Sequence, residues 1–349
     1  MKNGRPPAGP AGSDSRPFGR LLDLGPCEPF RAQAFAESVA VSVARGETPD
    51  TLILCRPDRP YVSLGFHQVS SEELEFAELK RRDLPVVRRV TGGGTTFLDP
   101  SQVFYQLVYR AQPAPGLSGG PTDFAEALRA PLALLEAFGL PARLRPPSDL
   151  VIAGRKVSGN AGGTWEDAHL LVGGLLGTAD VEAMAAVVRC PSEGFRTFLE
   201  EEMARALTGL DQELPDPPSP AELSRRLRAA FEKFGPWTLA PGPPLPAEEE
   251  RFLHEVLPRH RDPAWVHLPP IPRAPSAVRR ALRVAGARHC LLLEVPGSGE
   301  YFVLAEGGKV LSAFRAGPPS SEAPPGEPVL PGGPAWEDLQ GTVRSWAGA

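Results

Sequence analysis

A run of three glycines beside two arginines, Arg88-Arg89-Val90-Thr91-Gly92-Gly93-Gly94, is the segment of this sequence best suited to binding a charged ligand. Consecutive glycines let the backbone turn tightly and present N–H groups without obstruction by Cβ atoms. A guanidinium beside such a loop can hold a carboxylate or phosphate through paired hydrogen bonds. A glycine hinge flanked by solvated arginines is the alternative interpretation. The loop is not a Walker motif, because no Gly-Lys-Ser/Thr follows it.

A second candidate lies at residues 148–161, where Asp149 precedes Gly154-Arg155-Lys156-Val157-Ser158-Gly159-Asn160-Ala161. The pattern predicts a hairpin turn at residues 153–155, after which Lys156 begins a strand with small residues behind it. A lysine there is a compact cation that can approach a ligand closely. Asp149, across the predicted hairpin, could contact either this lysine or a metal ion. The alternative is a hairpin turn with exposed charges.

Lysine is scarce in this chain, which draws attention to Lys156. The 37 basic residues include only five lysines: Lys2, Lys80, Lys156, Lys233 and Lys309. Arginine therefore serves almost wherever positive charge alone is needed. A lysine within a motif indicates a position where a compact ammonium is required.

The composition is that of a globular protein with many loops. Hydrophobic residues make up 42% and charged residues 23% of the chain, and we expect most of the 36 glycines and 42 prolines in loops and linkers. The net charge of −5, without blocks of like charge, argues against nucleic-acid or membrane partners. The four cysteines form no Cys-x-x-Cys motif, and no apolar run is long enough to span a bilayer. We therefore expect a cytoplasmic protein.

The elements that must position the two motifs alternate between helices and short strands. Hairpins mixed with helices predict an α+β fold, with helices packed on a mixed, largely antiparallel sheet. Helices are predicted at 31–44, 71–82, 123–138, 181–189, 193–207, 220–234 and 247–257. Strands are predicted at 51–55, 61–64, 85–88, 103–109, near 144, and at 150–152, 156–160, 169–176, 289–295, 300–305 and 309–315.

Changes in composition divide the chain into four parts. We expect a disordered tail at 1–16, a large domain at 17–265 and a small accessory β unit at 266–317. A Pro/Gly-rich tail at 318–349 would close with a terminal helix.

Taken in order, these motifs resemble the lipoate–protein ligase family. Its pattern is matched by Tyr61-Val62-Ser63-Leu64-Gly65, then the arginine–glycine run, then Asp149 and the Lys156 segment. The resemblance covers roughly residues 18–263. It implies the catalytic fold that lipoate–protein ligases share with octanoyltransferases and biotin–protein ligases, here in the 17–265 domain. The 266–317 unit could correspond to the accessory C-terminal domain of some ligases.

The resemblance also implies roles for individual residues. Lys156 would contact the acyl carbonyl and phosphate oxygens, where an ammonium stabilises developing negative charge. The glycine loop would close over the acyl group and the acyl-adenylate, and Asp149 would orient Lys156 or help to place Mg²⁺. No resident metal site is expected. The residues expected to bind the acyl group or adenylate are Tyr61, Ser63, Gly65, Arg88, Thr91, Gly92, Gly93, Gly94, Phe97, Asp149, Ser158 and Gly159.

The chain departs from the family pattern where ligand-side histidines are usual. Leu98 replaces one histidine, and Leu171-Val172 replace a His-His pair. These losses weigh against adenylation more than against acyl binding. The nearby His169 is interpreted as a surface or core histidine rather than a substitute.

Cys190 raises an alternative mechanism. Octanoyltransferases of this fold use a Cys/Lys pair, and Cys190 lies 34 residues after Lys156. A thiolate there, with its pKa lowered by Lys156, could take an octanoyl group from acyl carrier protein as a thioester without ATP. The following Pro191-Ser192-Glu193 instead resembles a ligase segment that needs no cysteine. Cys27, Cys55 and Cys290 are interpreted as structural.

The resemblance implies that the chain is a lipoate–protein ligase. It would activate lipoate or octanoate with ATP and Mg²⁺ to acyl-AMP, and acylate the lysine of lipoyl domains in 2-oxoacid dehydrogenases or the glycine cleavage H protein. One alternative is an octanoyltransferase that uses Cys190 and Lys156, with acyl carrier protein as donor. Another is a non-catalytic acyl-binding relative. Biotin is disfavoured as substrate, because the Gly-Arg-Gly-Arg-type loop of biotin ligases is absent.

Overall fold

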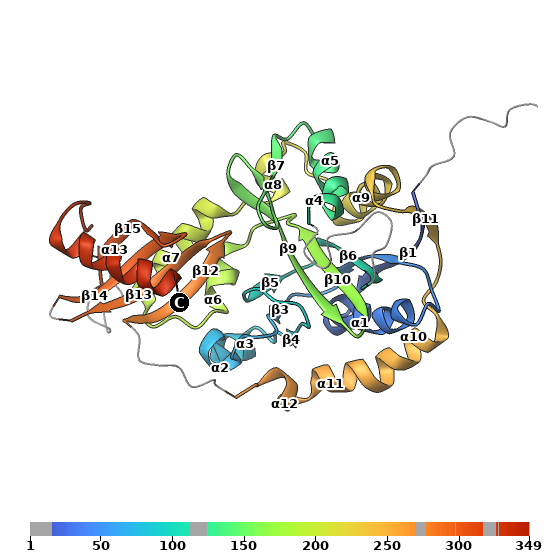
Figure 1. Cartoon of the computed structure of the whole chain (residues 1–349), viewed down its shortest axis with the longest axis horizontal. Coiled ribbons are helices and arrows are strands. Elements are labelled where there is room, and N and C mark those ends of the chain that lie inside the picture. The colour runs from blue at the N-terminus through green and yellow to red at the C-terminus, as the bar shows by residue number, and fades with distance from the viewer. Residues whose placement is uncertain are drawn as a thin grey trace, which may run out of the picture.

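The computed structural model describes residues 16–111, 124–269, 277–296, 298–316, 326 and 328–348 (Figure 1). The predicted N-terminal tail and residues 317–325 of the Pro/Gly-rich segment lie outside these ranges, apart from residue 16. Among the described helices, none is both long and apolar enough to cross a membrane.

The largest sheet joins eight of the described strands in the order β11-β1-β2-β6-β10-β9-β8-β7. Strand β1 runs parallel to β11 and to β2, and the other neighbours are antiparallel. This confirms the predicted mixed, largely antiparallel sheet. The strands are β1 (Phe18–Cys27), β2 (Thr51–Pro57), β6 (Val103–Arg110), β7 (Ala142–Arg145), β8 (Asp149–Ile152), β9 (Arg155–Trp165), β10 (Ala168–Leu175) and β11 (Thr238–Pro241).

Helices cover both faces of this sheet because side chains alternate along its buried strands. In β2, Leu52 and Leu54 pack in the core that includes α5 and α9, whereas Ile53 packs in the core that includes α1. Helix α1 begins at Pro29, with the Glu28 side chain accepting from the backbone N–H groups of Phe30 and Arg31. The helices here are α1 (Pro29–Ala44), α4 (Phe124–Ala127), α5 (Arg129–Ala137), α8 (Leu210–Glu213) and α9 (Pro220–Phe234).

A three-stranded sheet, ordered β4-β3-β5, carries the glycine loop between β4 and β5. It shares a hydrophobic core with α6, α7 and the C-terminal sheet, through residues such as Leu64, Phe97, Phe198 and Phe302. The elements of this region are β3 (Tyr61–Leu64), β4 (Val86–Arg88), β5 (Thr96–Leu98), α2 (Ser70–Glu73), α3 (Phe76–Arg81), α6 (Val181–Ala186) and α7 (Glu193–Ala206).

A helical strap follows β11 and runs along α1, drawn in orange in Figure 1. It comprises α10 (Pro246–Arg251), a π-helical segment (Phe252–Val256), α11 (Leu257–Arg261) and α12 (Pro263–Val266). Two buried carboxylates attach it, because Glu248 accepts from Arg20, and Glu37 on α1 pairs with His260 and Arg259.

The C-terminal part is a four-stranded antiparallel sheet with one helix on it. One face packs on α7, and the other packs on α13 through Leu339 and Val343. The terminal helix of the predicted tail therefore belongs to the core of the β unit. The elements are β12 (Val278–Ala285), β13 (Arg288–Val295), β14 (Gly299–Glu306), β15 (Lys309–Arg315) and α13 (Pro334–Ala347).

Strands β1, β11 and β12 were not predicted from the sequence. Strand β1 contains a Gly-Pro pair and a bulge near Asp23, and β11 is a short strand beside prolines. The helix predicted at 71–82 forms two short helices, because Leu74 leaves helical geometry and pairs with Val188. Long-range pairing outweighs helical periodicity at that point.

Candidate functional site

A cavity of about 230 Å³ lies between the glycine loop, strands β6, β9 and β10, helices α6 and α7, and the C-terminal end of strand β12. Six of the twelve residues predicted to bind the acyl group or adenylate line it, as does Lys156: the six are Ser63, Gly93, Gly94, Phe97, Asp149 and Gly159. The two sequence motifs therefore meet at one site.

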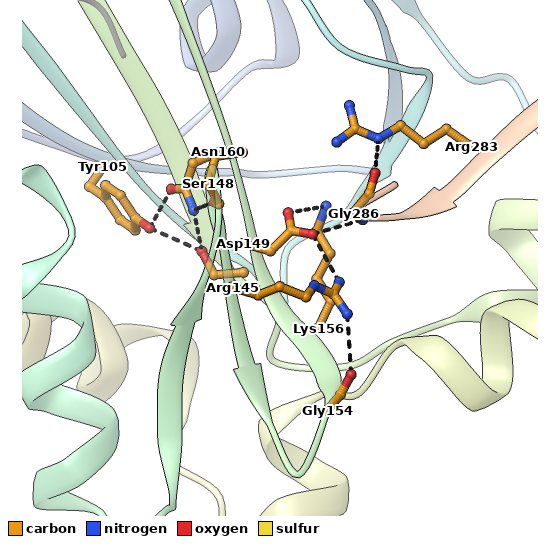
Figure 2. Close-up of polar contacts among 10 residues, drawn as sticks. Tyr105, Arg145, Ser148, Asp149, Gly154, Lys156, Asn160, Arg283 and Gly286 are labelled. Carbon is orange, nitrogen blue, oxygen red and sulfur yellow. Dashed lines mark hydrogen bonds and ion pairs between the residues drawn. The ribbon is translucent and has the colours of Figure 1, made fainter. Parts of the chain in front are cut away.

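Lys156 and Asp149 form the charged centre of this cavity (Figure 2). The turn at Ala153 and Gly154 folds β8 against β9, and Lys156 Nζ lies 2.9 Å from Asp149 Oδ1. Asp149 Oδ2 accepts from Arg145 Nη2 at 2.9 Å and from the Gly286 backbone N–H at 2.9 Å. The carboxylate thus joins the catalytic-motif lysine to a turn of the C-terminal sheet.

The environment shifts the pKa values of both groups. Burial lowers the pKa of Lys156, and the charge of Asp149 opposes this effect without cancelling it. Burial would raise the pKa of Asp149, but Lys156 and Arg145 outweigh burial, so its pKa lies below the ordinary value. Asp149 thus favours the charged form of Lys156, and 23% of the Lys156 side chain stays exposed.

Gly159 and a polar network define the position of Lys156. A Cβ atom on Gly159 would lie 2.8 Å from both Cε and Nζ of Lys156, so the absence of a side chain there makes room for the ammonium. Behind it, Tyr105 Oη donates to Asn160 Oδ1 at 2.6 Å and lies 3.0 Å from Ser158 Oγ. Ser158 is fully buried in this network and outside the cavity lining, so it braces β9.

Arg89 organises the glycine loop. Its Nη2 donates to the carbonyl oxygens of Gly92 at 2.9 Å and Gly94 at 2.7 Å, and its Nη1 donates to the Ser63 carbonyl and hydroxyl at 3.1 Å each. Burial lowers the pKa of Arg89 to about 10. Arg89 therefore holds the curved backbone of the loop around one guanidinium, next to the cavity.

Arg88 has a different position from the one the resemblance implies. Its side chain is 0% exposed, is not part of the cavity lining, and donates to carbonyl oxygens of Gly65, Phe66, Gln68, Trp265 and Val266. Adjacent strand residues point to opposite faces, so only one of the two arginines can face the cavity. In this structure Arg88 attaches the helical strap to the small sheet, and Arg89 lies at the site.

The other predicted residues support the loop from behind. The hydroxyl of Tyr61 donates to Gln33, which lines the cavity. A Cβ atom on Gly65 would lie 2.0 Å from the Gly93 carbonyl oxygen, so the two backbones can meet only at a glycine. Thr91 is buried, and the Gly92 carbonyl oxygen accepts from Arg89. None of these four predicted residues, Tyr61, Gly65, Thr91 and Gly92, lines the cavity itself.

Apolar residues line the cavity where the resemblance places histidines. Leu98 and Val172 are lining residues, together with Phe97 and Phe104, whereas Leu171 is in the core on the opposite face of β10. His169 lies 3.1 Å from Thr164 Oγ1, is packed against Tyr109 and is not part of the lining. This apolar wall suits an alkyl chain.

Cys190 lies outside the cavity lining. It follows α6, packs against the core shared with α7 and the C-terminal sheet, and is only partly exposed. Burial raises the pKa of its thiol to about 11, against the opposing effects of Arg196 and Arg280. The lowering by Lys156 that the thioester mechanism requires is therefore not seen. Cys27, Cys55 and Cys290 are also free thiols.

Asp149 does not present a free carboxylate to a metal ion. Both of its oxygens are occupied by Lys156, Arg145 and the Gly286 N–H. Over the described part of the chain, no cluster of three or more His, Cys, Asp or Glu side chains could hold a metal. These contacts are those of a carboxylate that holds the Lys156 ammonium in place.

The sequence interpretation missed the contribution of strand β12, which was not predicted. Arg283, Val284 and Ala285 line the cavity, more than 120 residues after Lys156. Nothing in their local pattern indicates a site. Arg89, by contrast, had a signal, because strand alternation places the two neighbouring arginines on opposite faces.

Comparison with known proteins gives a consistent result. The family model described as "Lipoyl protein ligase A/B catalytic domain" matches residues 28–232. A curated relative, "Octanoyltransferase LipM" of Moorella thermoacetica, is 26% identical over 266 residues, which cover 71% of this chain and 97% of the relative.

Two solved structures are similar in fold. A bipartite lipoate protein ligase, solved in a study of an archaeal lipoylation system with its E2 lipoyl domain from Thermoplasma acidophilum, has a TM-score of 0.62 at 21% identity. It covers 72% of this chain and 96% of the matched chain. A lipoate-protein ligase A bound with ATP has a TM-score of 0.60 at 20% identity, over 72% of this chain and 98% of that chain.

Proposed function

Because the chain belongs to the lipoyl protein ligase A/B catalytic domain family, we propose that it transfers a lipoyl or octanoyl group to the lysine of a lipoyl domain. The acceptors would be lipoyl domains of 2-oxoacid dehydrogenases or the glycine cleavage H protein. The observation that carries this proposal is Lys156, whose ammonium lies in a cavity with an apolar wall on one side and the Arg89-held glycine loop on the other.

We infer that the acyl group is activated by ATP. The acyl carboxylate attacks the α-phosphorus of ATP and pyrophosphate leaves, giving acyl-AMP. The acceptor lysine amine, having lost a proton, then attacks the carbonyl and AMP leaves. Both steps build negative charge on oxygen atoms, which the Lys156 ammonium and the backbone N–H groups of the glycine loop stabilise. In support, none of the described residues that line the cavity is a cysteine, and a similar fold has been solved with bound ATP.

An octanoyltransferase is the second candidate. The Moorella thermoacetica relative, 97% of whose length is matched by this chain, carries that name. In this mechanism Cys190 would take an octanoyl group from acyl carrier protein, releasing the carrier thiol. The amine of the acceptor lysine would then attack the thioester carbonyl, forming the amide and releasing the Cys190 thiolate. Met184, on the helix before Cys190, lines the cavity, as do Val187 and Val188 after that helix. Cys190 is therefore two residues beyond the last of these lining residues in the sequence. Its partly exposed thiol, with a pKa of about 11, would have to reach the cavity and ionise.

Mass spectrometry of a lipoyl domain tests the proposal. The purified protein is incubated with lipoate and MgATP in one reaction and with octanoyl carrier protein in another. We expect a lipoyl mass in the first reaction, lost in Lys156→Ala and kept in Lys80→Ala, since Lys80 is an exposed residue of α3. Octanoylation only in the second reaction, abolished by Cys190→Ser, would favour the transferase. Modification in neither reaction would refute both.

A further inference from the structure

The C-terminal end of strand β12 forms part of the wall of the candidate site, and the turn that follows it contacts Asp149. Arg283, Val284 and Ala285 line the cavity, and the next residue, Gly286, donates its backbone N–H to Asp149. Gly286 has a φ of +56°, and an added Cβ would lie 3.2 Å from Arg145 Nε. The turn therefore contacts Asp149 through a conformation that favours glycine.

Arg283 differs from the other cations of the lining in its contacts. Lys156 is paired with Asp149, and Arg89 is surrounded by carbonyl oxygens. The Arg283 side chain is exposed, and its Nε donates to the Gly286 carbonyl oxygen at 2.6 Å. Its two terminal nitrogens have no hydrogen-bond or carboxylate partner among the described residues (Figure 2). They are free to bind a ligand.

The side chains around the cavity carry more positive than negative charge. Lys156, Arg145 and Arg283 carry three positive charges near one carboxylate, Asp149. Asp149 already accepts hydrogen bonds on both oxygens. An arginine with two free N–H groups on one edge matches the geometry of a phosphate.

We propose that Arg283 binds the phosphate of the acyl donor, so that the C-terminal sheet supplies a substrate-binding residue of the active site. This inference rests on the proposed function. The phosphate has two chemical sources: the nucleotide phosphates of ATP and acyl-adenylate, or the phosphodiester of a carrier protein's phosphopantetheine. Either group would be held at the mouth of the cavity, with the acyl chain along the apolar wall.

The test compares Arg283→Met with Arg279→Met. Arg279 is an exposed residue on the same strand, paired with Glu294 outside the cavity lining. For Arg283→Met we expect KM for the donor to rise about ten-fold, the size of one charge-assisted hydrogen bond, with KM for the lipoyl domain unchanged. Arg283→Lys should recover part of the loss. Arg279→Met should behave as wild type, and thermal unfolding of all variants should agree within a few degrees.

Two donor arms distinguish the sources, and a binding assay separates this inference from the proposed function. KM is measured for ATP with lipoate and for octanoyl carrier protein, and calorimetry measures binding of ATP and of the carrier protein without turnover. Weaker binding of either ligand to Arg283→Met supports the inference even if no transfer occurs. Unchanged binding and unchanged KM in both arms would overturn it while leaving the transferase or ligase activity intact. A wild-type protein that binds neither ligand would overturn it as well.

Discussion

Lys156 Nζ lies 2.9 Å from Asp149 Oδ1, and the same carboxylate accepts a hydrogen bond from the Gly286 N–H in the β12–β13 turn of the C-terminal sheet. The ammonium is therefore set by residues from two parts of the chain more than a hundred residues apart. Asp149 raises the pKa of Lys156 against the effect of burial and holds its ammonium in an ion pair.

Replacing Asp149 with Asn should move the alkaline limit of activity to lower pH. In the proposed mechanism transfer needs the Lys156 ammonium, so activity should fall as pH rises through the pKa of Lys156. Burial already lowers that pKa, and Asp149 opposes the lowering. Without the carboxylate the pKa should fall further. The measurement is a pH profile of kcat/KM, and Asp83→Asn, at an exposed site, is the control. An unshifted alkaline limb would show that Lys156 titration does not govern activity.

Gly159→Ala should reduce activity without much loss of stability. The new methyl group would lie 2.8 Å from Lys156 Cε and Nζ, and the flexible lysine can move aside. A displacement of about 1 Å at a catalytic group can cost roughly 100-fold in rate, so we expect a loss of at least ten-fold in kcat. Thermal unfolding should stay within a few degrees. Gly341→Ala, where no atom lies within 4 Å, should leave kcat unchanged. Full activity of Gly159→Ala would mean that the observed lysine position is not required.

Arg88→Met should destabilise the protein rather than weaken donor binding alone. The variant leaves five carbonyl oxygens without their buried donor, three beside the small sheet and two on the helical strap. We expect a loss of roughly 3 kcal/mol in unfolding free energy, measured by urea denaturation. Arg81→Met, on exposed α3, should cost far less. Wild-type stability with a raised KM for the donor would instead place Arg88 at the ligand.

Cys190 should react slowly with alkylating reagents near neutral pH. With a pKa of about 11, it is roughly one thousandth thiolate at pH 8, and labelling should accelerate as pH approaches 11. Mass spectrometry after timed iodoacetamide treatment measures this directly.

Cys190→Ser should leave ATP-dependent transfer unchanged. Fast labelling at pH 8, blocked by prior incubation with octanoyl carrier protein, would be evidence for the thioester mechanism.

Much of the fold could be predicted because its signals are local. The helix at 220–234 and the strands at 61–64 and 309–315 match the structure at both ends, since periodicity, a serine cap and turn residues define them within a few neighbours. Strands β1, β11 and β12 escaped prediction because their pairing partners, rather than their own patterns, stabilise them.

The sequence by itself determined the two motifs, the family and the lysine at the centre of the site. A glycine run, a hairpin turn and a scarce lysine are properties of contiguous residues, and they hold whatever packs around them. Only the tertiary structure decided which arginine faces the cavity, that Cys190 lies outside the cavity lining, and that Gly286 and Arg283 reach Asp149 and the cavity. These depend on side-chain direction and on contacts between distant segments, because burial and charge act through space and not along the chain.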